Sequence, residues 1–214
     1  MPWPAPCPVA ASPDASTAAA RTLAWVDRAV IGLNLCPFAR AVRVKNQIRC
    51  VVIDATDVEA LLRALCDEAQ RLMDTEPAQC ETTLIVHPQV LTDFGDHNDF
   101  LDLAEAALDE IGCDGVLQLA SFHPDYQFAG TDPDDVTNAT NRSPYPTLHL
   151  IREESIDRAV QAFPDAAAIY ETNIATMEAL GEAGWSDLLA ACREDAAASG
   201  CGATPSDPSH GQPS

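Results

Sequence analysis

The sequence predicts an α/β fold with a small parallel or mixed sheet of about four strands and flanking helices. Short apolar runs of strand type alternate with longer segments in which apolar residues recur at helical spacing. This alternation is typical of crossovers that place parallel strands in one sheet. A ferredoxin-like α+β arrangement is the alternative, because these patterns do not give the order of the strands.

Each element follows from a local signal. Leu23, Val26, Val30 and Leu33 recur at helical spacing and predict the first helix, and Pro37 predicts a non-helical corner after it. Helices are expected at about 17–33, 56–73, 99–111, from 155 onward and 165–181, with a short one through 192. Strands are expected at 48–53, 82–86, 116–122 and 147–151, with a long polar loop at 125–146.

The 214 residues fit one domain, expected at 17–195. Residues 1–16 and 196–214 are rich in Pro, Ala, Ser and Gly, which predicts a disordered leader and a disordered tail. Cys201 and His210 fall in this tail, so they are not candidates for a site.

The composition excludes several classes of function. The net charge is −21, from 33 acidic and 12 basic residues, so binding to nucleic acid or to an anionic membrane surface is not expected. No apolar run approaches the roughly 20 residues of a membrane span, and the first 20 residues lack the order of a signal peptide. The eight cysteines are scattered without a CxxC pair, which predicts reduced thiols and a cytoplasmic location.

Two strands end in the same dipeptide, which predicts a shared site. His87-Pro88 and His123-Pro124 follow apolar runs 36 residues apart, about one strand–helix–strand unit. If these strands are neighbours, a spacing of roughly 4.8 Å brings both imidazoles to one ligand. Packing residues with satisfied hydrogen bonds are the alternative interpretation.

Five runs of the chain resemble a bacterial family catalogued as domain of unknown function 1415. The runs are Asn34–Ala39, Glu81–Pro88, Asn98–Leu101, Phe122–Gly130 and Asn141–Leu150. The resemblance covers about residues 20–185, and its most specific parts are Phe122–Gly130 and Asn141–Pro146. It implies one domain with one shared site, and it implies no particular activity.

The chemistry of these residues defines the candidate site. The expected catalytic residues are His123, His87, Asp125, Tyr126 and Cys36. The expected substrate-binding residues are Arg142, Asn141, Ser143 and Arg152, because a guanidinium grips a carboxylate or phosphate with two hydrogen bonds. An ion pair between Arg142 and the acidic stretch 132–135, and a buried structural Cys36, are the alternatives.

A divalent metal (zinc, iron or manganese) is the cofactor that these residue types suit. The expected ligands are His87 and His123, with His149 as the third nitrogen. His97 is the other option for that third nitrogen, although it reads as a solvated loop residue before a helix that starts at Asn98 or Asp99.

The function expected from these residues is an enzyme of hydrolase, lyase or transferase type that acts on a small anionic metabolite. Its site is based on histidine, with or without a metal, at the carboxyl ends of the strands. A non-catalytic protein that binds a metal or small ligand is one alternative. An enzyme that uses the Cys36 thiol as nucleophile is another.

Overall fold

The computed structural model describes residues 14–162 and 166–200. Most of the expected leader and tail, including Cys201 and His210, lies outside this part. The helices are α1 (Ala15–Trp25), its π-helical continuation η1 (Val26–Ile31), α2 (Ala39–Val44), α3 (Val58–Asp74), α4 (Phe94–Glu110), the 3-10 helix η2 (Val136–Asn141), α5 (Glu153–Ala162) and α6 (Ala166–Gly200). The strands are β1 (Ile48–Val52), β2 (Thr82–Val86), β3 (Leu117–Phe122) and β4 (Thr147–Arg152).

The four strands form one mixed sheet in the order β1-β2-β4-β3. β1 and β2 are parallel, and β4 runs antiparallel to both β2 and β3. The predicted α/β class is therefore confirmed. The expectation that β2 and β3 are neighbours is wrong, because β4 is inserted between them.

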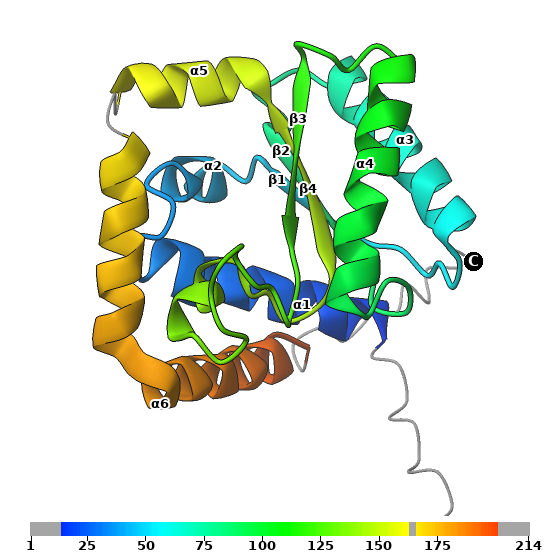
Figure 1. The fold of residues 1–214 in the computed structure, drawn as a ribbon. Coiled ribbons are helices and arrows are strands. Elements are labelled where there is room, and N and C mark those ends of the chain that lie inside the picture. The colour runs from blue at the N-terminus through cyan, green and yellow to red at the C-terminus, as the bar shows by residue number, and fades with distance from the viewer. Residues whose placement is uncertain (1–13, 163–165, 201–214) are drawn as a thin grey trace, which may run out of the picture.

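The two faces of the sheet are covered differently (Figure 1). α3 and α4 cover one face, where Leu61, Leu65, Ile85 and Leu148 are fully buried. The other face carries Leu84 and Phe122 and packs against α1 and η1, with α6 alongside. α2, α5 and α6 surround this second face without filling all the space above it, as the cavities described below show.

Several helix ends differ from the sequence predictions. α4 starts at Phe94, because the Asp93 carboxylate accepts a hydrogen bond from the Asp96 N–H and caps the helix five or six residues earlier than expected. His97 is consequently a fully buried helix residue, and its prediction as a solvated loop residue is wrong. At the two ends of the described chain, Asp14 caps α1 and α6 extends to Gly200.

α6 bends at Gly181, whose φ of 67° lies in the left-handed region that favours glycine. The bend accounts for the expected end of a helix at this residue. None of the described helices combines the length and the apolar composition that crossing a bilayer requires.

Arg152 ties the end of β4 to the end of α3. Its guanidinium donates hydrogen bonds to the carbonyl oxygens of Leu72, Thr75 and Cys80, and the residue is 9% exposed. The carbonyls at the C-terminus of a helix have no partner within that helix, so Arg152 acts as their cap. This placement favours a structural role over the expected role in substrate binding.

We expect Arg152→Met to lower the free energy of unfolding by about 2–4 kcal/mol, because the Thr75 and Cys80 carbonyls lose their guanidinium donor and Leu72 keeps only the Thr75 N–H. Urea unfolding followed by circular dichroism measures this change. Arg63→Met, on the exposed surface of α3, is the matched control and should change stability by less than about 0.5 kcal/mol. Equal effects of the two substitutions would contradict the capping role.

Candidate functional site

Both predicted His-Pro corners lie at one edge of the sheet. Val86 and Phe122, the last residues of β2 and β3, each pair with Thr147 at the start of β4. The backbone N–H of His87 donates to the Pro146 carbonyl, and that of His123 donates to the Asn141 carbonyl. Because β4 separates the two strands, their ends are roughly 10 Å apart, twice the expected spacing.

His97 bridges this gap from the first turns of α4. Its ring centroid lies 5.4 Å from that of His87 and 5.1 Å from that of His123. The earlier start of α4 is what carries His97 to this edge. The structure therefore brings His87 and His123 together with His97, which sequence analysis named only as the alternative to His149 for the third nitrogen.

His149 lies on the opposite face of the sheet. Side chains alternate along a strand, so His87 and His123 point to the face that α4 covers, whereas His149 shares the other face with its pair partner Leu84. Its Nε2 lies 2.5 Å from the Thr82 hydroxyl, which itself donates to the Leu150 carbonyl, so Nε2 is the donor. The expected set of His87, His123 and His149 is thus not brought together.

Burial keeps the three clustered imidazoles neutral. All three are 0% exposed. Desolvation lowers the pKa of His87 to about 4 and that of His97 to about 3, with repulsion between the rings as a further cause. Desolvation also lowers the pKa of His123, against the raising effect of the nearby Asp125 carboxylate.

The hydrogen bonds of the cluster define its tautomers. His87 Nδ1 donates to the Val90 carbonyl at 2.9 Å, which leaves Nε2 as an acceptor. His123 Nδ1 accepts from the Asp125 N–H at 3.1 Å, so the ring proton sits on Nε2. These two Nε2 atoms and both nitrogens of His97 are buried without a partner among the described residues. Within the same residues, no three or more His, Cys, Asp or Glu side chains are grouped as ligands of a metal ion.

Two cavities adjoin the loop between β3 and β4, and a third lies over the second face of the sheet. The edge cavity, of about 430 Å³, is lined by Cys36, Tyr126 and Asn141 together with Ser121, Asn173 and Glu105. The arginine cavity, of about 190 Å³, is lined by Arg21, Arg142, Arg193, Ser143 and Tyr145. The apolar cavity, of about 350 Å³, lies over the second face of the sheet. None of the three clustered histidines is among the described residues that line these cavities.

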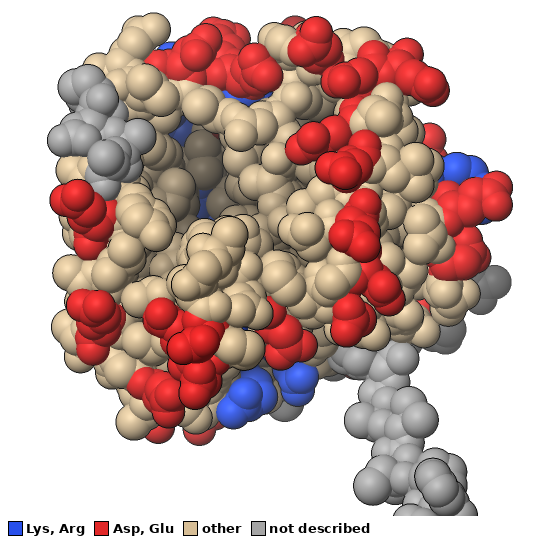
Figure 2. All heavy atoms as spheres, viewed as in Figure 1, with Lys and Arg blue, Asp and Glu red and all other residues tan. Residues whose placement is uncertain are grey.

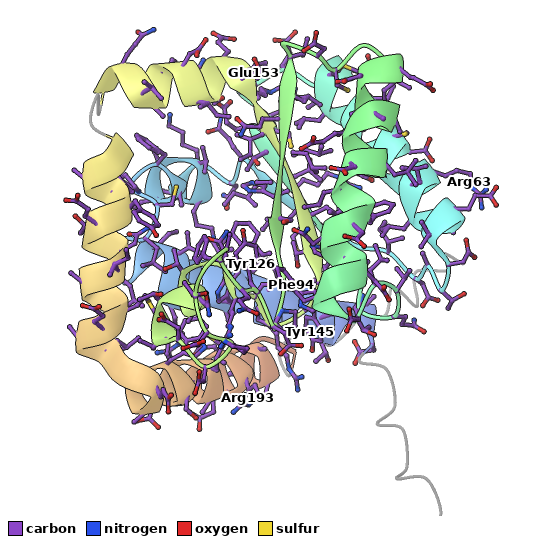
Figure 3. The ribbon with its side chains drawn as sticks, in the orientation of Figure 1. Arg63, Phe94, Tyr126, Tyr145, Glu153 and Arg193 are labelled. Carbon is purple, nitrogen blue, oxygen red and sulfur yellow. The ribbon has the colours of Figure 1, made fainter. Side chains whose placement is uncertain are left out.

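Seven of the ten predicted site residues are therefore divided between these two cavities and the histidine cluster, whereas Arg152, His149 and Asp125 lie elsewhere. Asn141 lines the edge cavity, whereas the next two residues, Arg142 and Ser143, line the arginine cavity. Phe94 connects the cluster to the edge cavity, since its ring contacts both His123 and Tyr126. Figure 3 shows Phe94 and Tyr126 close together near the end of β3. Asp125 is exposed beside this turn.

Arg142 holds the long loop through backbone carbonyls. Its Nε donates to the Tyr126 carbonyl at 3.1 Å, and Nη2 donates to the Pro133 carbonyl. No ion pair joins Arg142 to a carboxylate in the stretch 132–135, in contrast to the alternative that sequence analysis raised. These two hydrogen bonds use Nε and Nη2, and the charge of Arg142 also helps to lower the pKa of Asp135, after that residue's hydrogen bonds to Thr137.

The arginine cavity contains arginines without carboxylate partners, in a chain with an excess of acid. Six other arginines form ion pairs with Asp or Glu: Arg28, Arg43, Arg49, Arg63, Arg71 and Arg158. Arg21, Arg142 and Arg193 form none within the described chain, and no described Asp or Glu lines their cavity. Arg21 Nη1 donates to the Tyr145 hydroxyl at 3.0 Å, while its Nε is buried without an acceptor.

Sequence analysis missed Arg21 and Arg193, because both sit in helices and carry no local motif. Figure 3 places Arg193 on α6 and Tyr145 on the loop before β4 at the same edge of the molecule. Only the scarcity of basic residues in the sequence could have pointed to Arg21 and Arg193. In a chain with so few basic residues, any arginine that forms no ion pair is a candidate for binding an anion.

Cys36 sits between two cavities. It follows the end of η1, where its N–H donates to the Val30 carbonyl, in the corner that Pro37 predicts. The half-buried residue lines both the edge cavity and the apolar cavity. The six described cysteines are all free thiols.

We expect the buried histidines to make the protein less stable as the pH falls from 6.5 to about 4.5. Their folded pKa values lie below the unfolded value of 6.5, so the unfolded chain binds protons first. Each such histidine lowers the free energy of unfolding by up to about 1.4 kcal/mol for each pH unit of this fall. Urea unfolding at several pH values measures the slope. His97→Phe should make it shallower, and Asp96→Asn, on the exposed side of the same turn, should not. Equal slopes in wild type and His97→Phe would refute this assignment.

The comparisons with known proteins bear on the chain as a whole. No curated protein and no solved structure matches it. The model of a family described as "Protein of unknown function (DUF1415)" matches residues 17–187, which is most of the chain. This match agrees with the resemblance of the five sequence runs. The chain therefore belongs to the DUF1415 family.

Proposed function

We propose that the protein binds a small anionic molecule in the arginine cavity and acts on it as a hydrolase-, lyase- or transferase-type enzyme. The observation that supports this proposal is the set of three arginines, Arg21, Arg142 and Arg193, that lack carboxylate partners around one cavity. In a chain of net charge −21, most exposed guanidinium groups find an acid nearby. Arg40 also forms no ion pair, but Arg21, Arg142 and Arg193 share one cavity, and an anion from outside the chain would explain this grouping.

The hydrogen-bond donors of this cavity suit a carboxylate or a phosphate. Arg21 offers its buried Nε–H, and Arg142 offers Nη1. The Tyr145 hydroxyl accepts from Arg21, so its own hydrogen is free to be donated to the ligand. Arg193 is exposed, so its contribution is the attraction of an anion from solution rather than a buried contact.

The chemical step is assigned to the turn that follows β3. Pro124 lines the arginine cavity, and it is flanked by His123 and Asp125, with Tyr126 next along the chain. His123 is fully buried behind this wall, and it is neutral with its proton on Nε2, the form in which it would act as a general acid once a ligand reaches it. A non-catalytic binding protein would use the same cavity, and turnover of the ligand distinguishes an enzyme from such a protein.

The free thiols of the described cysteines support the expected cytoplasmic location.

We expect inorganic phosphate or succinate to bind saturably when titrated calorimetrically into the full chain. Arg21→Met should weaken binding at least about tenfold, because it removes a charge-assisted contact, and Arg193→Met should weaken binding by a smaller factor, because it removes only long-range attraction. Arg63→Met, whose partner Glu59 lies one turn away on α3, is the control and should leave the Kd unchanged. No saturable binding by wild type, or equal Kd values for all three variants, would exclude the arginine cavity as the anion site.

A second candidate function is transition-metal binding by His87, His97 and His123. The observation that favours it is four buried ring nitrogens without partners on three neutral imidazoles. Neutral imidazole nitrogen is a common ligand of zinc and iron and also binds manganese. To bind one ion, the rings would have to turn until one nitrogen of each converges.

We expect untagged protein to contain about one zinc, iron or manganese ion per chain if this second function holds. Elemental analysis by mass spectrometry measures the content, and added zinc should raise the melting temperature. His97→Phe should abolish both effects, whereas Asp125→Asn, on the adjacent exposed turn, should abolish neither. Metal-free wild-type protein whose melting temperature does not respond to these three ions would rule this function out.

A further inference from the structure

The second face of the sheet is open above its apolar side chains. Figure 2 shows a deep hollow on the side where α5, α6 and β3 lie in Figure 1. Leu84 and Phe122 of the sheet line the apolar cavity. The rest of its wall includes Phe38 from the corner before α2, Val42 from α2 and Ile156 from α5. Apolar side chains that line an open hollow of about 350 Å³ lack packing partners on that side, and a concave apolar surface of this size is typical of a ligand site.

The polar side chains in this wall are paired with one another. The Thr82 hydroxyl bonds to His149 and to the Leu150 carbonyl. The Glu81 carboxylate accepts from Arg158 and from the Ser155 hydroxyl. A polar ligand would therefore give up its hydrogen bonds to water and find few in return, whereas an apolar chain would gain from burial.

The apolar cavity continues into the edge cavity. Val30, Cys36, Ala120 and Phe122 line both, so the two spaces meet at these residues. The far part of the edge cavity is polar, with Tyr126, Asn141 and Asn173. The Asn173 Nδ2 donates a hydrogen bond to the Leu35 carbonyl, so the Asn173 Oδ1 is left as an acceptor. Glu105 in the same wall disfavours an anionic group there.

We propose that these joined cavities bind an amphipathic molecule with an aliphatic chain and an uncharged polar head. The chain lies in the apolar cavity, and the head lies in the edge cavity beside Asn141 and Tyr126. A cavity of 150 Å³ holds one benzene, so the apolar cavity accommodates a chain of roughly ten carbons. The Cys36 thiol then faces the junction between head and chain. This site is separate from the arginine cavity and does not depend on it.

Primary alkanols from hexanol to dodecanol are the probe, titrated calorimetrically into the full-length protein. Each added methylene should tighten binding about fourfold until the chain outgrows the cavity near ten carbons, after which the Kd should level off. Ala159→Trp, on the wall of the apolar cavity, should abolish the dependence on chain length. Ala106→Trp, on the exposed face of α4, is the matched control and should bind as wild type does.

Thermal melting establishes that both variants fold, and binding of phosphate to Ala159→Trp provides a second check on an intact domain. A Kd that does not vary with chain length would overturn the proposal, as would equal binding by the two tryptophan variants. Alkanols that bind only by dissociating a dimer would also overturn it, because a second copy of the chain would then be the occupant.

Discussion

The insertion of β4 between β2 and β3 is the constraint on which the rest of the structure depends. Thr147 pairs on one side with Val86 and on the other with Phe122. Both strand exits are therefore held at the same edge, but two strand spacings apart. A third group has to fill the space between them, and the early start of α4 supplies His97. The histidine cluster is in this sense a consequence of sheet order.

The alternation of side chains across the sheet separates two kinds of environment. His87 and His123 follow the last residues of their strands and point to the α4 face, where packing is tight and the rings lose contact with solvent. Leu84, Phe122 and His149 point to the other face, where the helices leave a cavity. A shift of one residue in register would exchange these environments, because it would turn every side chain to the opposite face.

Local signals in the sequence predicted much of the fold, and non-local pairing accounts for what they missed. The four strands lie within one residue of their predicted limits, because apolar runs and flanking Gly, Pro and Asp are local properties. The order of the strands depends on pairing between segments far apart in the chain, so no local pattern encodes it. The start of α4 was misplaced because Asp93, Asn98 and Asp99 are all competent caps. That error hid His97, and the unknown register hid the separation of His149 from the cluster.

The loop between β3 and β4 places polar residues that are neighbours in the sequence in two different cavities. At the end of η2, Asn141 lines the edge cavity while Arg142 turns to the arginine cavity, where its Nε is fixed by the Tyr126 carbonyl. The same turn thus forms part of the wall of both cavities, through Tyr126 on one side and Pro124 on the other. The two backbone contacts of Arg142, to the Tyr126 and Pro133 carbonyls, therefore hold in place the turn that separates the two cavities.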